Sequence, residues 1–395
     1  MTIIGLLTNK LVAVNLGPGG IVILGQLKSA MNLIMQLGIA GSNNLVVRLF
    51  TKKYSRHYLF RTILIISIII NIIFISLGFV YIDKLTLFLT GSIDLTDSMY
   101  WLILGIPAIS LLSLNTAIIN GQAKQVLFSV LVLSYSFVFL LMLALSVTIT
   151  LDIMVIEFVL SLVISSAAIT FWNRRYFLIS LRKTFKIRLV KKVLIYGLTL
   201  IFPFLVNTLV LIYLRTVMME KDITGAGLWQ AVWQISDNLA SIVYLYVISV
   251  LLPKALHKKA PMETFRYLLK TYQMPLVLFI SGGIIFIVFS KQILSLLYDQ
   301  SFMLAEPLII YQLVGDFFKI IGWIFLLTIA SYGLLKLSIM IEVVNLVTSL
   351  LLIHYFVENY STIGASYAYM FKYIFYVLLM GIAFYIYSKQ KIKDV

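Results

Sequence analysis

Long apolar runs alternate with short polar segments along the whole chain, and every second polar segment is strongly basic. A helix of about 20 residues crosses a hydrocarbon core of about 30 Å. The apolar runs therefore predict an all-α, polytopic membrane protein with about twelve transmembrane helices. Their expected ranges are 1–16, 20–50, 62–82, 98–119, 126–149, 154–173, 193–219, 226–252, 268–290, 307–330, 337–357 and 363–388.

The Lys and Arg residues outside these ranges indicate the orientation. If the connections between the expected helices are numbered from the N-terminus, these residues lie almost entirely in the even-numbered connections. The odd-numbered connections contain only Lys84, Lys221 and Lys291. Because loops on the cytoplasmic side are enriched in Lys and Arg, both termini are expected to be cytoplasmic.

The composition agrees with a membrane protein and excludes several other classes. Hydrophobic residues make up 62% of the 395 residues and charged residues 12%, against about 25% charged in soluble domains. The net charge of +16 is concentrated on one membrane face, where anionic lipids attract it, so no nucleic-acid partner is expected. The chain has no cysteine and only three scattered histidines, so we expect no metal site and no cofactor.

A basic segment at 173–192 divides the chain. It predicts an N-terminal six-helix bundle at 1–172, a basic cytoplasmic linker at 173–192 and a C-terminal six-helix bundle at 193–395. The plainest interpretation of the linker is an interfacial segment that lies on anionic headgroups.

Weak internal similarity favours two pseudo-symmetric halves around a central cavity. The residues that open the expected helix 20–50, Gly17 to Gly20, resemble those that open 226–252, Thr224 to Gly227. Chance similarity between short glycine-bearing turns is the alternative. Repeated halves are common in transporters and place the substrate site between them.

Charged residues remain inside the expected spans after the loops are counted. The basic ones are Lys10, Lys28, Arg48, Arg215, Lys319 and Lys372, and the acidic ones are Asp237, Asp316 and Glu342. A charge that faces lipid at the helix centre costs about 2.5–3.5 kcal/mol, and a whole fold is stable by only about 5–15 kcal/mol. We therefore expect these side chains, apart from Arg48 near a helix end, to face each other or water.

Helical spacing places several of these charges on polar stripes. Steps of three and four connect Gln230, Gln234 and Asp237 on one helix, and Gln312, Asp316 and Lys319 on another. Five cations against three acids give a net positive cavity, which favours an anion.

Simpler explanations of the stripes stay open. Uncharged members of a stripe also hydrogen-bond helix to helix in ordinary bundles. Asp316 and Lys319 could form a purely structural ion pair, and Arg215 and Glu342 could snorkel to the interface. Aromatic residues beside the stripes suit sugar faces, but interfacial aromatic belts explain them equally well.

Several of these segments resemble a known family. Gly227-Leu228-Trp229-Gln230, continuing to Asp237, is similar to a signature of bacterial lipid-linked oligosaccharide flippases of the Wzx type, which translocate O-antigen or enterobacterial common antigen units. Tyr311 to Asp316 with Lys319, Ile341-Glu342-Val343, and Asn9-Lys10-Leu11 followed by Leu16-Gly17-Pro18 resemble further motifs of that family. The family belongs to the multidrug/oligosaccharidyl-lipid/polysaccharide (MOP) exporter superfamily.

The resemblance implies a flippase of lipopolysaccharide biosynthesis in the bacterial inner membrane. It would move undecaprenyl-pyrophosphate-linked oligosaccharide from the cytoplasmic to the periplasmic leaflet by alternating access, without catalytic residues. Lys10, Lys28 and Arg215 would hold the pyrophosphate, with Lys319 and, on spacing alone, Lys372 as further substrate-binding cations. The residues expected to line the cavity or to couple a cation are Gln230, Gln234, Asp237, Gln312, Asp316 and Glu342. The polysaccharide polymerase and chain-length regulator are further candidate partners.

The first expected helix departs from the family, whose first helix usually begins earlier. At about 1.5 Å per residue, residues 1–16 would span only about 24 Å. We therefore expect either a late start codon or a short, tilted first helix.

Two alternatives to a flippase remain. A cation-coupled drug or small-molecule exporter of the same superfamily would share the fold, but a cavity rich in acids would suit it better. A membrane polysaccharide polymerase or glycosyltransferase usually needs a large periplasmic loop or an acidic catalytic loop, and the segment Gly17 to Gly20 contains no acid.

Overall fold

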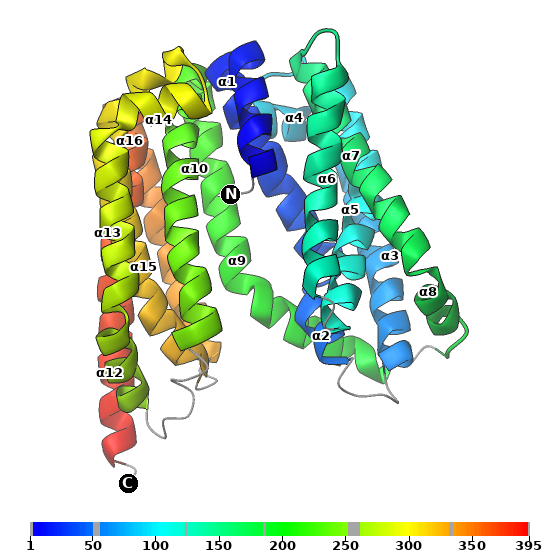
Figure 1. Ribbon diagram of the computed structural model, residues 1–395. Helices are drawn as coiled ribbons and strands as arrows, with labels where there is room; N and C mark the ends of the chain where they lie inside the picture. Colours follow the sequence, from blue (N-terminus) through cyan, green and yellow to red (C-terminus); the bar gives the residue numbers. More distant parts are fainter. Residues whose placement is uncertain are drawn as a thin grey trace. The chain divides into compact units, whose positions relative to one another are not determined.

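The computed structural model describes residues 3–49, 56–122, 125–184, 187–251, 261–331 and 335–393. All regular elements in these ranges are helical (Figure 1), as expected for the fold class. In chain order they are α1 (Ile3–Leu37), α2 (Asn43–Leu49), α3 (Arg56–Val80), α4 (Ile82–Thr90), α5 (Thr96–Gly121), α6 (Gln125–Leu145), α7 (Leu151–Trp172), α8 (Arg174–Leu181), α9 (Arg188–Lys221), α10 (Ile223–Tyr246), a π-helical turn (Val247–Leu251), α12 (Pro261–Thr271), α13 (Gln273–Val288), α14 (Ser290–Leu297), a 3-10 helix (Gln300–Leu308), α15 (Ile309–Ser331) and α16 (Leu335–Lys393).

Within the described ranges, nine helices are long and apolar enough to cross a membrane, or ten if the bent pair α12–α13 forms one span. Large apolar side chains are exposed along them, for example Ile68, Ile72, Val277 and Ile284. Exposure of such side chains is unfavourable in water and favourable in lipid. The chain is therefore a multi-pass membrane protein.

The sequence predicts about twelve spans, and the difference arises mainly in α1 and α16. Each of these two long helices is continuous by hydrogen bonding, yet each contains one residue with non-helical backbone angles: Gly17 (φ 64°, ψ −160°) and Ser361 (φ 51°, ψ −131°). The expected boundaries 16/20 and 357/363 fall at these two breaks. A helix of 59 residues would be about 88 Å long, so the break at Ser361 is needed if α16 is to stay within a bilayer.

The expected helix 20–50 is interrupted in the structure. Helix α1 ends at Leu37, and a turn at residues 38–42 precedes α2. Gly41 has a φ of 64°, a conformation that glycine adopts without steric cost. A Cβ at Gly41 would also overlap the carbonyl group of Gly197 on α9. The glycine therefore permits both the turn and this close approach.

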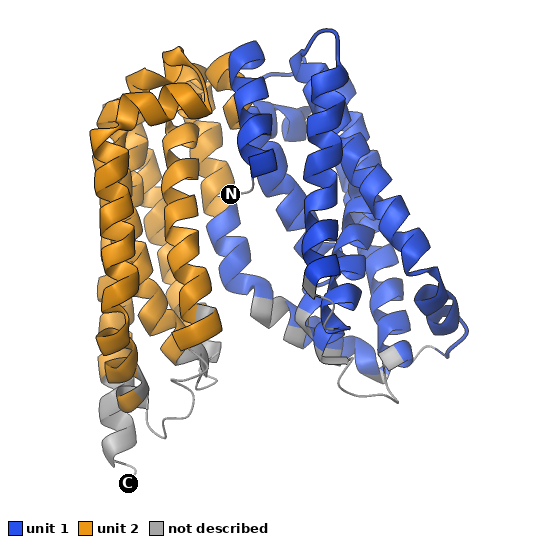
Figure 2. Cartoon of the chain, viewed as in Figure 1, with its two compact units in different colours: residues 1–16, 23–208 blue, residues 17–22, 209–395 orange. Residues whose placement is uncertain are grey.

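The chain forms two compact units (Figure 2). Unit 1 contains residues 1–16 and 23–208, and its core includes Phe60, Ile63, Leu114 and Ile118. Unit 2 contains residues 17–22 and 209–395, and its core includes Ile341, Tyr376, Met380 and Phe384. The expected division into bundles at 1–172 and 193–395 with a linker at 173–192 stays a prediction, as does a central cavity.

Candidate functional site

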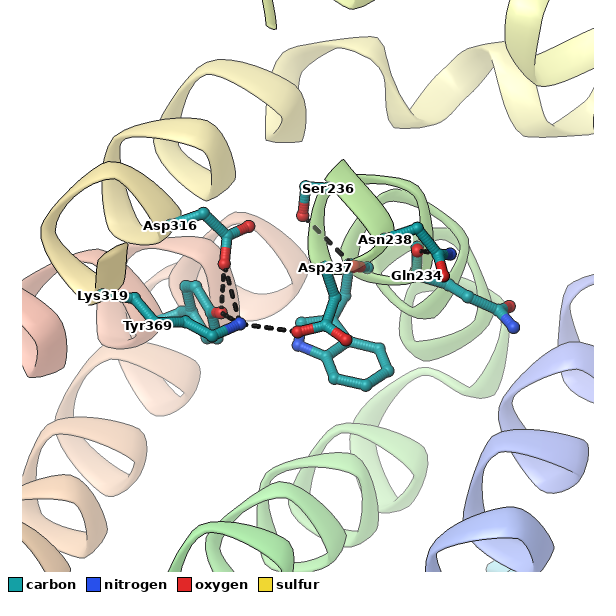
Figure 3. Close-up of polar contacts among 8 residues, drawn as sticks. Gln234, Ser236, Asp237, Asn238, Asp316, Lys319 and Tyr369 are labelled. Carbon is teal, nitrogen blue, oxygen red and sulfur yellow. Dashed lines mark hydrogen bonds and ion pairs between the residues drawn. The ribbon is translucent and has the colours of Figure 1, made fainter. Parts of the chain in front are cut away.

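Lys319 on α15 is the centre of a buried ionic network in unit 2. Its ammonium group lies 2.5 Å from Oδ1 of Asp237 on α10 and 3.1 Å from Oδ1 of Asp316, three residues earlier on α15. Tyr369 on α16 donates a hydrogen bond of 2.6 Å to the same Asp316 oxygen, and its hydroxyl accepts one of 3.2 Å from Lys319 (Figure 3). Three helices thus contribute to one network.

The burial of these groups differs, and the difference identifies the accessible member. Asp316 is fully buried and Lys319 nearly so, whereas the Asp237 side chain is 32% exposed. The rings of Trp323, Tyr369 and Tyr373 lie within 6 Å of the ammonium group, where ring faces attract cations. The network is therefore apolar on its flanks and reachable at Asp237.

Gln312 lies one helical turn before Asp316 and is fully buried. Neither its amide oxygen nor its amide nitrogen makes a hydrogen bond to any residue that the structure describes, and the same holds for Oδ2 of Asp316. A buried polar group without a partner costs about 1–3 kcal/mol. Among the described residues, the polar atoms of the α15 stripe are therefore only partly hydrogen-bonded.

Arg215 on α9 lies in a second polar cluster of unit 2. Its Nε donates a 2.7 Å hydrogen bond to Oε1 of Gln230, and its guanidinium group stacks 5.0 Å from the ring centre of Trp233. Arg215 is almost completely buried, so it is held inside the unit and does not snorkel.

Gln234 does not join the Lys319 network. It accepts a 3.2 Å hydrogen bond from the hydroxyl of Tyr298, and its side chain points away from Lys319 (Figure 3). The stripe Gln230, Gln234 and Asp237 thus serves three different contacts.

Glu342 and Lys372 lie on the two arms of α16. Glu342 is fully buried and accepts hydrogen bonds from Tyr376 (2.8 Å) and Asn345 (3.2 Å). Lys372 is also buried, and its ammonium group lies 4.9 Å from the ring centre of Tyr373. Neutral hydrogen-bond donors from both arms of α16 thus hold the Glu342 side chain.

Lys10 and Lys28 lie in unit 1, on the two arms of α1 that the break at Gly17 separates. The Lys28 ammonium group donates a 3.3 Å hydrogen bond to Oδ1 of the buried Asn9, the residue next to Lys10. This bond brings the two arms together. Both lysines are partly exposed, unlike the three buried cations of unit 2.

The structure brings together some of the predicted site residues and separates others. Asp237, Asp316 and Lys319 form one network, and Arg215 and Gln230 form a pair. Glu342 binds Tyr376 and Asn345, and Lys372 lies beside Tyr373. Gln234 and Gln312 join none of these groups. The expectation that the residues of both units share one cavity stays a prediction.

The sequence interpretation missed two partners. Tyr298 binds Gln234 from outside the expected stripes, and no local pattern indicates it. Asn9 binds Lys28, and its position beside Lys10 in the quoted motif was the available signal. In the ranges that the structure describes, no group of three or more His, Asp or Glu residues could hold a metal ion.

The fold is similar to that of solved flippase and transporter structures. The structure of the lipid II flippase MurJ in an inward closed conformation matches 96% of this chain and 84% of its own, with a TM-score of 0.79 and 16% sequence identity. The structure of an inward-facing multidrug resistance MATE transporter of the MOP superfamily matches 100% of this chain and 96% of the transporter chain. Its TM-score is 0.75 and its sequence identity 15%.

Two curated proteins are similar in sequence. The lipid III flippases of Escherichia coli (strain K12) and Shigella flexneri are each 24% identical over 169 residues, which cover 41% of this chain and 41% of each relative. The match thus spans about two fifths of the length of these relatives. No protein-family model matches the chain. The relatives named here are flippases and transporters, not enzymes.

Proposed function

We propose that this protein is a flippase that translocates undecaprenyl-pyrophosphate-linked oligosaccharide repeat units, of the O-antigen or enterobacterial common antigen type, from the cytoplasmic to the periplasmic leaflet. The bilayer would be the bacterial inner membrane, with both termini cytoplasmic. The polysaccharide polymerase and chain-length regulator would act on the product at the periplasmic face. The likeness to two lipid III flippases supports a lipid-linked substrate.

The observation that carries the proposal is the pair of partly exposed lysines on α1. In unit 2 the cations expected within spans, Arg215, Lys319 and Lys372, are buried, and Lys319 is paired with Asp237 and Asp316. Lys10 and Lys28 are instead partly accessible on two arms of one helix that a hydrogen bond brings together. Two accessible ammonium groups on one helix favour an anion over a cation as the bound group.

A pyrophosphate group matches this charge. Lysine ammonium groups bind phosphate oxygens as point charges, and a pyrophosphate that carries sugars cannot cross hydrocarbon without such partners. Lys10 and Lys28 would bind the pyrophosphate, with Arg215 as a further ligand. The polyprenyl chain would stay in lipid during the transport cycle.

The unit 2 network would then line or gate the pathway rather than hold the phosphate permanently. Two carboxylates already surround Lys319, so a phosphate would have to displace at least one of them to bind there. Asp237, the accessible carboxylate, is the group through which the cargo or a coupling cation would reach the network. Lys372 would be a further substrate-binding cation.

The experiment is a flipping assay with the purified chain in liposomes. Undecaprenyl-pyrophosphate-linked oligosaccharide is supplied on one face, and its arrival on the other is followed with an enzyme that modifies only exposed sugars. The proposal expects flipping by the wild-type chain and a loss of at least about tenfold in Lys10→Ala/Lys28→Ala, since each lost charge-assisted contact costs about 1.5–3 kcal/mol.

The exposed pair Arg266 and Lys270 on α12 offers a matched control. Arg266→Gln/Lys270→Gln removes the same amount of charge from another part of the chain and should flip normally. Absence of flipping by the wild-type chain in a sealed, correctly reconstituted liposome would reject the function. Normal flipping by the lysine variant would reject the binding site alone.

A cation-coupled exporter is the second candidate, because the MATE transporter matches the full length of this chain. Transport of an organic cation, unchanged in Lys10→Ala/Lys28→Ala, would favour it. An exporter of cations has no use for two accessible lysines in its pathway, so the two functions predict opposite effects of removing them.

A further inference from the structure

Helix α8 and its flanks, residues 171–183, form a fixed surface of unit 1 that we call the α8 surface. Only Asn173 separates α8 from the end of α7 at Trp172. Its inner face is attached to α3: Nδ1 of His57 lies 2.8 Å from Oγ of Ser180, and Arg61 donates a 2.7 Å hydrogen bond to the carbonyl oxygen of Leu181. The helix is therefore held against α3 by two polar contacts.

Aromatic contacts strengthen this attachment. The ring of Phe60 meets those of Tyr176 and Phe177 edge to face, at 4.9 and 5.2 Å between ring centres. Such pairs contribute about 0.5–1.5 kcal/mol each beyond their buried area. The outward residues of α8 are consequently presented in a defined orientation.

The outward face combines positive charge with apolar side chains. Arg174, Arg175 and Arg182 are exposed, and the stretch 158–219 of the sequence contains no Asp or Glu. Phe171 and Trp172 are each 67% exposed. The guanidinium group of Arg174 lies 4.2 Å from the ring centre of Phe171, so the charged and apolar groups are interleaved.

The depth of this face relative to the membrane indicates what kind of partner it binds. Helix α7 is a candidate membrane span that ends at Trp172, so the next turn of chain lies at the level of the lipid headgroups. Tryptophan is typical of that depth, and Arg and Lys near it are attracted to anionic lipids by about 1 kcal/mol per residue. A soluble acidic protein or a nucleic acid would satisfy the arginines but leave the exposed aromatic rings in water.

We propose that the α8 surface binds the phosphate-bearing headgroups of anionic phospholipids in the leaflet predicted to be cytoplasmic. Arg174, Arg175 and Arg182 bind the phosphates, and Phe171, Trp172 and Leu178 insert among the upper acyl chains. This binding site is separate from the proposed substrate site on α1 and does not depend on it.

The test uses the natural absence of cysteine. The full chain with Leu178→Cys carries one environment-sensitive fluorophore on the exposed side of α8 and is reconstituted into phosphatidylcholine liposomes. These contain an equal mole fraction of either brominated phosphatidylglycerol or brominated phosphatidylcholine, whose bromines quench the fluorophore on contact. Leu269→Cys, an exposed apolar position on α12, gives the reference.

We expect phosphatidylglycerol to quench the Leu178→Cys label at least about twofold more strongly than phosphatidylcholine, because three arginines concentrate the anionic lipid there. Arg174→Gln/Arg175→Gln/Arg182→Gln should abolish this preference while quenching by phosphatidylcholine persists. An unchanged circular dichroism spectrum and an unchanged Leu269→Cys signal would show that the triple variant is folded.

Two outcomes would overturn the proposal. Equal quenching by the two lipids in the wild-type background would mean that the surface does not select anionic headgroups. Absence of quenching by either lipid would mean that α8 lies outside the bilayer interface, as expected if its partner were a soluble polyanion.

Discussion

The ammonium group of Lys319 lies 2.5 Å from the carboxylate of Asp237, a residue 82 positions earlier in the chain. The same ammonium group contacts Asp316 on its own helix, so one cation serves two carboxylates. Removing one partner of a buried ion pair costs about 3–5 kcal/mol, whereas replacing the whole group by apolar residues is often tolerated. Removal of Lys319 alone and replacement of Lys319 together with its partner should therefore change the free energy of unfolding by different amounts.

Lys319→Met should destabilise unit 2 by about 3–5 kcal/mol, because it leaves the fully buried carboxylate of Asp316 without its cation. The double variant Lys319→Met/Asp316→Asn should recover a large part of that loss. Measuring the free energy of unfolding of the two variants in detergent tests both expectations.

Lys291→Ala is the matched control for this prediction. Lys291 forms an ion pair with Glu306 in which both side chains are exposed, and such pairs contribute about 0–1 kcal/mol. Equal effects of Lys319→Met and Lys291→Ala would contradict the buried network.

Arg215→Lys keeps the charge but should still destabilise the protein by about 1.5–3 kcal/mol, the value for a hydrogen bond to a charged group. Lysine has neither the Nε that binds Gln230 nor a planar group to stack on Trp233. A melting temperature unchanged from wild type would show that neither contact stabilises the fold.

Tyr376→Phe should cost about 1.5–3 kcal/mol, because its hydroxyl donates to the buried carboxylate of Glu342. Tyr272→Phe removes a hydroxyl that donates instead to the neutral carbonyl of Ile320, so its cost should be about 1 kcal/mol. Chemical denaturation of both variants measures the difference, and the reverse order would argue against an ionised Glu342.

Local sequence pattern predicted more of this architecture than of its contacts. The apolar runs and the glycine and proline residues near Gly17 indicated where helices begin and end, because those signals act within a few residues. The turn at residues 38–42 was missed, since an apolar run of the right length masked Gly38 and Gly41. Helical periodicity likewise placed Asp316 and Lys319 on one face, as the structure shows.

Partners on other helices were beyond the reach of periodicity. Nothing near Lys319 in the sequence indicates Asp237 or Tyr369, because their contact depends on how α10, α15 and α16 pack. Counting residues cannot show that Lys319 lies between two carboxylates, because that contact depends on tertiary packing.

Gly227→Ala tests the packing at the break in α1. The segment 17–22 belongs to unit 2, and a Cβ on Gly227 of α10 would overlap the carbonyl oxygen of Pro18. Backbone atoms cannot rotate away as a side chain does, so relief requires a shift of one helix, and overpacking of this kind costs about 1–3 kcal/mol.

The control is Gly381→Ala on α16, where the added Cβ would meet only Phe325 at an ordinary distance of 3.8 Å. Alanine is favoured over glycine within a helix by about 1 kcal/mol, so Gly381→Ala should leave the melting temperature unchanged or raise it. Gly227→Ala should lower it, although the helix propensity gained is the same. If both variants melted alike, α1 would not pack against α10 through Pro18, and the assignment of residues 17–22 to unit 2 would lose its physical basis.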